Sequence, residues 1–249
     1  MNIINKKRLL VVSGFIVALI ALILSIKLPD YIGYRMRISF FPLSKGTYWI
    51  YQGPTKWTLN NSNKVVEKTL TWKMEVVDTI QKGQYFIAIL KGHPSDLAWY
   101  EEGKSRGDYL LVRKGIGKYY LAFDTLMKAV LDKAETNPKL LDDLLDDYSI
   151  FINLPLTIGK KYGDPEQVAR PDNAYCWYVE SENKVSLNDI KGLSSNLTGM
   201  QYQLRFVTLP DQEYIKIVDG IGITEYKYVH HGTVSETDLR LIEFHRGAS

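Results

Sequence analysis

The side chains that could do chemistry in this chain are few and widely spaced. The candidate metal ligands are the adjacent His230 and His231, with His93, His245, Glu225 and Asp238 as further donors. Adjacent residues on a strand point to opposite faces, so the pair could bind one ion only at a bulge or a turn. No H-x-H, H-E-x-x-H or paired-cysteine spacing supports a zinc site. The sequence therefore favours a structural histidine pair, with a metal site as the weaker alternative.

A second set of residues predicts a binding site for an apolar ligand. Two strand-like runs alternate with a period of two, so one face of each carries the large apolar side chains. On a curved sheet these side chains would line a concave pocket, and on a closed sheet they would fill the core. The predicted ligand-binding residues are Trp72, Met74, Tyr202, Leu204 and Phe206.

Two further features are expected to be structural. Cys176 is the only cysteine, and it is expected to be buried and unreactive because it lies in a strand pattern between two aromatic residues. Four aspartates between residues 142 and 147 carry the oxygen ligands that calcium prefers, but without EF-hand spacing. The expected state is a solvated helix face whose charges are offset by nearby lysines, namely Lys128, Lys133 and Lys139. We therefore expect no catalytic residues and no cofactor.

The elements that hold these residues are expected to be antiparallel strands. Short runs rich in Val, Ile, Thr and Tyr are separated by turn-prone residues such as Lys82-Gly83 and Asp219-Gly220. Such short connections imply antiparallel pairing, because parallel strands need a crossover of about a dozen residues or more. The prediction is a mainly β fold, an antiparallel meander forming a curved sheet, a half-barrel or a sandwich. The candidate strands are 47–52, 70–76, 84–90, 109–113, 118–123, 175–187, 201–206, 213–218, 223–230 and 237–245.

A short two-helix insertion is expected at about residues 124–148. Thr125–Ala134 predicts a first helix, and Asn137-Pro138 predicts the cap and first turn of a second. The second helix would cover the sheet with its apolar face, which carries Leu140, Leu141, Leu144, Leu145 and Tyr148.

The chain also contains a weak internal sequence repeat. Phe41–Trp49 reads as Pro-Leu, a turn glycine and then an aromatic strand, and Leu154–Tyr162 reads the same way. Two β-rich halves separated by the helical insertion would explain the similarity, and chance is the alternative.

The N-terminal segment predicts a membrane anchor. Leu9–Ile26 contains eighteen residues without a charge, preceded by three basic residues and followed by Lys27. A helix of this length reaches about 27 Å, close to the roughly 30 Å hydrocarbon core, and no A-x-A-like cleavage site follows it. The leading basic residues favour an N-terminus inside the cell. The predicted organisation is a cytoplasmic N-terminus at 1–8, a transmembrane helix at 9–27, a juxtamembrane linker at 28–40 and an extracytoplasmic β-rich domain at 41–249.

The charge of the chain argues against one class of partner. The formal net charge is only +3, and the Lys and Arg residues are scattered rather than gathered in blocks. Nucleic-acid binding is therefore not expected. The expected partners are the lipid bilayer, through residues 9–27, and an apolar ligand or a protein.

Several short motifs resemble those of a group of uncharacterised bacterial exported proteins, many of them lipoproteins. The motifs are Phe-Pro-Leu-x-x-Gly-x-x-Trp-x-Tyr at 41–51, Pro-Leu-x-x-Gly at 155–159, Cys176-Trp177, Gly220-Ile221-Gly222-Ile223 and His230-His231-Gly232-Thr233. The resemblance spans most of residues 41–245 and implies an extracytoplasmic β-rich domain without an established activity. This chain lacks a lipobox cysteine, so the predicted helix would have to replace the lipid anchor.

Three functional hypotheses remain open from the sequence. The leading one is a non-enzymatic, membrane-anchored domain of a bacterial cell envelope that binds an apolar ligand, an envelope component or a protein. The second is a metal-assisted hydrolase whose ligands would be His230 or His231, His93, and Glu225 or Asp238. The third is an accessory subunit of a membrane complex, in which Gly14 and Ala18 would allow close helix approach.

Overall fold

The computed structural model of this chain describes residues 40–59 and 62–248. Residues 39–249 group into one compact unit by their contacts. The predicted N-terminus at 1–8, the predicted transmembrane helix at 9–27 and all but the last residue of the predicted linker lie outside the described residues. Within the part of the chain that is described, no helix has the length and apolar character needed to cross a membrane.

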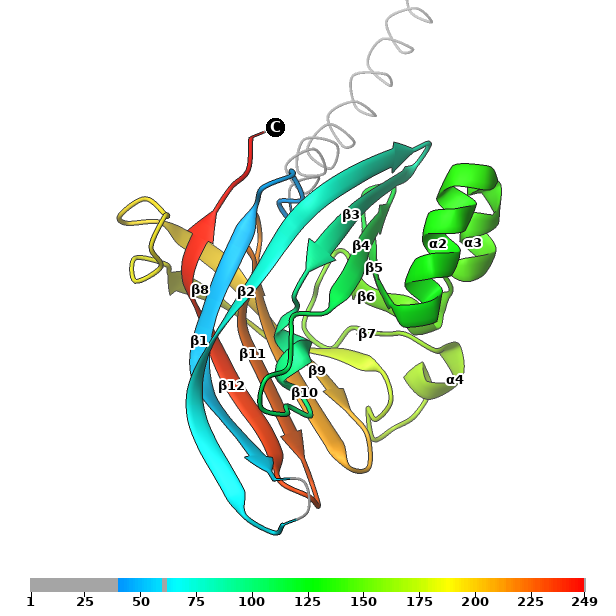
Figure 1. Cartoon of the computed structure of the whole chain (residues 1–249). Coiled ribbons are helices and arrows are strands. Elements are labelled where there is room, and N and C mark those ends of the chain that lie inside the picture. Colours follow the sequence, from blue (N-terminus) through cyan, green and yellow to red (C-terminus); the bar gives the residue numbers. More distant parts are fainter. Residues whose placement is uncertain (1–39, 60–61, 249) are drawn as a thin grey trace, which may run out of the picture. The chain divides into compact units, whose positions relative to one another are not determined.

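Within the described ranges, twelve strands form one antiparallel sheet (Figure 1). Their order across the sheet is β6-β5-β4-β3-β2-β1-β12-β11-β10-β9-β8-β7, so β1 pairs with β12. The strands are β1 (Tyr48–Thr58), β2 (Val65–Lys82), β3 (Tyr85–Lys91), β4 (Asp108–Lys114), β5 (Lys118–Phe123), β6 (Ile150–Asn153), β7 (Lys161–Tyr162), β8 (Trp177–Ser186), β9 (Thr198–Val207), β10 (Asp211–Val218), β11 (Gly222–His230) and β12 (Ser235–His245).

The predicted mainly β, antiparallel meander is confirmed. Every predicted strand falls on one of the observed strands, and the turn-prone dipeptides lie in the hairpins between them. The prediction had two faults. It missed the short strands β6 and β7, and it gave only seven residues to β2, which has 18. Neither missed strand is long enough to show a period of two.

The sheet curls until its edge strands, β6 and β7, come close. Of the predicted alternatives, a curved sheet, a half-barrel or a sandwich, the structure is a single, nearly closed curved sheet. The Tyr162 hydroxyl on β7 donates to the Phe151 carbonyl on β6 over 3.1 Å. The Phe151 ring meets the Trp177 ring edge-on at 5.9 Å, which closes the same gap from the inside. Side chains rather than a backbone ladder therefore close the seam between β6 and β7.

The predicted repeat has a counterpart in the backbone. Gly46 and Gly159 have φ values of +83° and +84°, in the left-handed region that favours glycine. The Gly46 amide donates to the Val76 carbonyl at 2.8 Å, and the Gly159 amide donates to the Val179 carbonyl at 2.9 Å. A register shift follows each valine, in the β2–β3 ladder and in the β8–β9 ladder. The chain thus enters β1 and β7, the first strands of the two halves β1–β6 and β7–β12, through equivalent glycine turns. The two halves meet at two equivalent junctions: a hydrogen-bonded ladder joins β12 to β1, and the seam separates β6 from β7.

The helical insertion covers the outer face of the sheet at β4 and β5 (Figure 1). Helix α2 (Asp124–Thr136) matches the first predicted helix and buries Val130 and Ala134. The second predicted helix is broken into short turns, η2 (Pro138–Leu140), α3 (Leu141–Leu144) and η3 (Asp147–Ser149). Proline does begin η2, as predicted.

The lysines that pair with the aspartates of this insertion are not the predicted ones. Lys114 approaches Asp142 at 2.5 Å, and Lys118 approaches Asp147 at 3.6 Å. Both lysines flank the β4–β5 turn, which the sequence could not place beside the insertion. The predicted Lys133 pairs instead with Asp132, its neighbour in α2.

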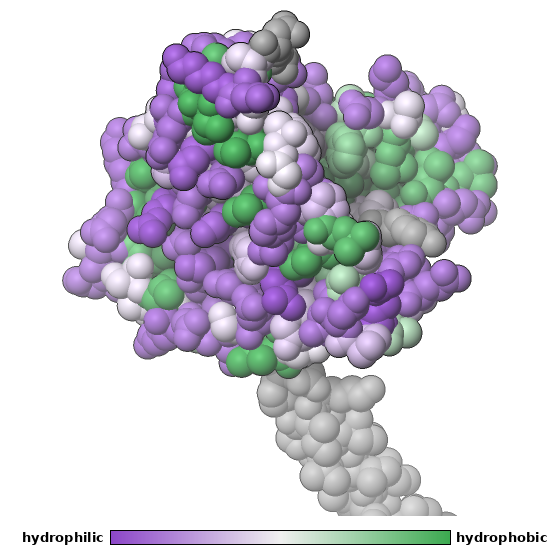
Figure 2. All heavy atoms as spheres, turned by 90° about the horizontal axis from the view of Figure 1, so that it is seen from below, coloured by the Kyte–Doolittle hydropathy of each residue, from purple (hydrophilic) through white to green (hydrophobic). Residues whose placement is uncertain are grey.

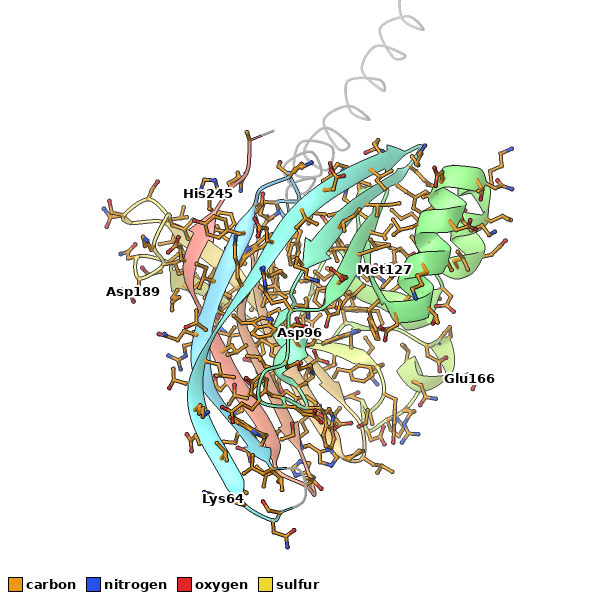
Figure 3. All side chains as sticks on the ribbon, in the orientation of Figure 1. Lys64, Asp96, Met127, Glu166, Asp189 and His245 are labelled. Atoms are coloured by element: carbon orange, nitrogen blue, oxygen red, sulfur yellow. The ribbon has the colours of Figure 1, made fainter. Side chains whose placement is uncertain are left out.

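A short 3₁₀ helix, η1 (Pro94–Leu97), lies within the curve of the sheet, where Figure 3 shows Asp96. Leu97 has no exposed surface, and η1 contacts β11 across the interior. The last helix, α4 (Pro165–Val168), follows β7. The interior of the sheet is therefore occupied by part of the chain itself.

Candidate functional site

The five predicted ligand-binding residues all lie on the inner face of the sheet. Met74 and Leu204 have no exposed surface, Trp72 is 8% exposed, and Tyr202 and Phe206 pack partly buried against the same core. Three cavities on the described residues have volumes between about 210 and 450 Å³, and none of the five lines any of them. Binding of an apolar molecule by these side chains stays a prediction.

Trp72 takes part in a polar network centred on Asp96. The buried Asp96 carboxylate accepts hydrogen bonds from Trp72 Nε1 at 3.1 Å and from the Tyr109 hydroxyl at 2.7 Å. It also accepts the backbone amides of His93 and Gly107, at 3.0 and 3.1 Å. Four donors therefore converge on one carboxylate and fix η1 against β2 and β4.

His93 is the N-cap of η1, and its ring is buried. The Ser95 amide donates to His93 Nδ1, so Nδ1 is unprotonated and the ring proton lies on Nε2. Nε2 has no hydrogen-bond partner, and the His93 ring packs near the rings of Tyr109, Phe151 and Tyr226. Burial lowers the pKa of His93 to about 4, against a smaller opposite effect of Asp96. His93 is therefore neutral at physiological pH.

A second group of polar side chains lies on the inner face near the ends of β10 and β11. Asp211 accepts hydrogen bonds from the Tyr228 hydroxyl at 2.5 Å and from His230 Nδ1 at 2.8 Å. Desolvation would raise the pKa of Asp211, but these two bonds lower it overall. The Trp99 ring covers His230 at a centroid distance of 4.3 Å.

Glu213 lies two residues further along β10, on the same inner face. It is half-buried, and desolvation raises its pKa to about 7, while a hydrogen bond with Tyr226 lowers it in part. Glu213 and Asp211 are therefore neighbouring carboxyl groups whose pKa values are shifted in opposite directions.

This shift predicts how stability depends on pH. The raised pKa means that native Glu213 holds its proton more tightly than unfolded Glu213, so stability falls as pH rises from about 4.5 through about 7. At pH 8 ionised Glu213 costs about 3 kcal/mol, which Glu213→Gln should recover. Chemical denaturation should show Glu213→Gln more stable than the parent at pH 8 and equal to it at pH 4.5. The control Glu236→Gln removes only a half-exposed ion pair with Lys56 and should change stability by less than about 1 kcal/mol at both pH values. A Glu213→Gln effect independent of pH would contradict the assignment.

The candidate metal ligands point to separate places. His230 binds Asp211 inside the sheet, while His231 Nε2 lies 2.8 Å from Gln212 Nε2, on the residue next to Asp211. Glu225 pairs with Lys216 on the outer face at 2.7 Å. Across residues 40–59 and 62–248, no three His, Cys, Asp or Glu side chains form a group that could hold a metal ion. The structure does not bring the hydrolase ligand set together.

Two spacings typical of nucleophilic catalysis, Gly-x-Ser-x-Gly and Ser-x-x-Lys, are present in the chain, so an expectation that both are absent is wrong, but they lie in unsuitable elements. Gly103–Gly107 reads Gly-x-Ser-x-Gly, yet it lies in the loop between η1 and β4, whereas a nucleophile elbow needs a strand-to-helix turn. Ser181 and Lys184 have Ser-x-x-Lys spacing within β8, where residues three apart point to opposite faces. Cys176 is buried, and burial raises the pKa of its thiol.

A groove lies on the outer face of β9–β12. Its volume is about 450 Å³, within the range of roughly 300–1,000 Å³ that is typical of small-ligand sites. Its lining comes from outward-facing residues of four neighbouring strands. They are Gln203, Gln212, Tyr214, Lys216, Glu225, Lys227, Val229, Asp238 and Arg240.

The charges in this groove are incompletely paired. Lys227 lies directly opposite Asp238 in the β11–β12 ladder, and Glu225 lies directly opposite Arg240. Neither neighbouring pair closes an ion pair, although Lys216 and Glu225 do so on the same face. Oppositely charged residues facing each other across two strands normally attract. Asp238, Arg240 and Lys227 therefore keep their hydrogen-bonding groups open to the groove.

Comparisons with known proteins were made at the levels of sequence and structure. No protein-family model and no curated protein matches the sequence. Among solved structures, the chain is similar to a candidate exported protein with a YmcC-like fold from Bacteroides fragilis NCTC 9343, with 11% identity, 83% of this chain and 98% of that chain covered, and a TM-score of 0.38. A candidate lipoprotein from Parabacteroides distasonis ATCC 8503 gives 13% identity, the same coverage and a TM-score of 0.39. MucB gives 10% identity, coverage of 89% and 60%, and a TM-score of 0.26.

These TM-scores lie below 0.5, so the likenesses establish neither a shared fold nor a shared function. The motifs on which the resemblance to exported proteins depends are not tested by these comparisons.

Proposed function

We propose that this protein is a non-enzymatic binding protein of the bacterial cell envelope. Residues 9–27 would anchor it in the membrane, and the β domain, on the extracytoplasmic side, would bind a polar envelope component in the groove of β9–β12. Of the three ligand types that the sequence left open, an envelope component suits this groove better than an apolar molecule does.

The observation that carries the proposal is the groove with its unpaired charges. Asp238 does not form an ion pair with Lys227 opposite it, and Arg240 does not form one with Glu225 opposite it. A polar ligand could form hydrogen bonds with both Asp238 and Arg240. The inner face instead carries large, fully buried side chains, including Trp49, Tyr51 and Tyr226. Seen from below, the surface is mainly hydrophilic with scattered apolar patches, which also suits a polar partner (Figure 2).

The proposal is tested by binding of the full chain, purified in detergent, to separated wall, lipid and protein fractions of a bacterial envelope. The double variant Asp238→Ala/Arg240→Ala should weaken retention on one fraction at least tenfold. The control Lys91→Ala/Asp108→Ala removes an exposed ion pair on β3 and β4 and should leave retention unchanged. Equal retention of parent and groove variant on all fractions would refute the groove as the binding site.

The location is tested separately. Protease added to spheroplasts should digest the domain if residues 9–27 hold it outside the membrane, because the hairpins between strands are accessible. Full protection, with a cytoplasmic control protein also intact, would place the domain inside and end the envelope proposal. The accessory-subunit alternative predicts instead that Gly14→Ile abolishes a co-purifying partner.

A further inference from the structure

We infer that the ligand of the β9–β12 groove is a saccharide chain, recognised through its hydroxyl groups. This inference rests on the proposed function and names the chemical class of the ligand. It follows from the kinds of hydrogen-bonding groups in the groove, from their charge balance and from the one aromatic side chain among them.

The lining offers donors and acceptors side by side. Asp238 is an acceptor, and Arg240 and Lys227 are donors. Gln203 Nε2 already donates to Glu180, and the Gln212 amide already contacts His231 and Tyr214, so the open groups are those of the three charged side chains. In the ladder Asp238 faces Lys227, and Arg240 lies two residues from Asp238 on the same face of β12. A sugar hydroxyl can donate one hydrogen bond and accept another. Two neighbouring hydroxyls can therefore link the Asp238 carboxylate to the Arg240 guanidinium, which do not bind each other directly.

The charge balance disfavours a strongly anionic ligand. The lining contains three cationic and two carboxylate side chains, and the pair Lys216–Glu225 is already neutralised at 2.7 Å. The charged groups of the lining without an ion-pair partner among the described residues are the cations of Lys227 and Arg240 and the carboxylate of Asp238. The Asp238 carboxylate would repel a phosphate placed between the two cations. Recognition of phosphate normally uses clustered arginines and lysines without an adjacent carboxylate.

Tyr214 supplies an apolar wall. Its hydroxyl donates to Gln212 Oε1 at 3.2 Å, which holds the ring in place along the groove. Tyrosine presents a flat apolar body together with a polar edge, as a sugar ring presents an apolar C–H face bordered by hydroxyls. The groove spans four adjacent strands, or roughly 14 Å at about 4.8 Å per strand spacing, so it is long enough for several sugar units.

The test measures binding of soluble oligomers of N-acetylglucosamine, glucose and mannose to the full chain in detergent by calorimetry. At least one oligomer should bind, and Asp238→Ala, Arg240→Ala and Tyr214→Ala should each weaken its binding about tenfold or more. The control Lys91→Ala, on β3, should leave the affinity unchanged. Affinity should also vary little between low and high salt, because hydroxyl groups carry no charge to be screened.

Each alternative outcome is informative. If no oligomer binds, but an envelope protein or inorganic phosphate binds and depends on Asp238 and Arg240, the groove is a binding site and the saccharide inference is wrong. If an oligomer binds equally well to parent and groove variants, both the saccharide inference and the groove assignment are wrong. A steep loss of affinity with salt would point to an ionic ligand and would overturn the inference.

Discussion

Replacing Asp96 with alanine is expected to lower the free energy of unfolding by about 4 kcal/mol. The substitution would leave four donors without an acceptor inside the sheet, those of Trp72, His93, Gly107 and Tyr109. Each buried donor left unpaired costs about 1–3 kcal/mol, and partial relaxation keeps the total below the sum. Thermal unfolding should show a drop of about 10 °C for a domain of this size.

The matched control for Asp96 is Asp108→Ala. Asp108 is an exposed aspartate that pairs with Lys91 at 2.9 Å, and its removal should cost less than about 1 kcal/mol. Equal effects of the two substitutions would show that the Asp96 network does not hold η1 in place.

Replacing Gly53 with alanine is expected to destabilise the domain by about 3 kcal/mol or more. A Cβ at Gly53 would lie 1.8 Å from the carbonyl oxygen of Asp238 and 3.1 Å from the Cα of Leu239, both backbone atoms of β12. Backbone atoms cannot relieve the clash by changing rotamer, as a side chain can, so strands β1 and β12 would have to move apart. Equilibrium denaturation of the purified variant measures the loss.

Gly117→Ala provides the control for Gly53. A Cβ at Gly117 would meet its nearest neighbour, the Leu154 carbonyl oxygen, at an ordinary 3.5 Å. Its effect on the free energy of unfolding should stay within about 1 kcal/mol. A Gly53→Ala variant as stable as this control would mean that β1 and β12 lie further apart than described.

The strands could be predicted from the sequence because their signals are local. The alternation of Leu70, Trp72, Met74 and Val76 depends only on residues within one strand, and the turn glycines mark its ends. The repeat was visible for the same reason, since Gly46 and Gly159 follow the same Pro-Leu pair. The break of the second predicted helix was not predicted, and Asp142 and Asp147 on either side of it pair with lysines of the β4–β5 turn, which is distant in the sequence.

The candidate sites were harder to predict, because they depend on which strands lie side by side. Asp238 and Arg240 look like ordinary surface charges in the sequence, and only the register with β11 shows that their opposite neighbours leave them unpaired. Asp96 follows no motif, and its importance comes from a loop that folds back into the sheet. The alternation within β10, with Asp211 and Glu213 on one face, was the one local signal that could have drawn attention to the inner polar group.

The pairing of β1 with β12 determines when the sheet can be completed. Tyr48 pairs with His245, so this ladder cannot form until synthesis has passed residue 245. Until then one edge of β1, eleven residues long, has no partner, and a free edge of this length invites pairing with other chains. Each half of the chain can assemble its own hairpins early, because those connections are short. The growing polypeptide therefore passes through a stage in which β1 must be shielded, and a chain cut off before β12 should aggregate rather than fold.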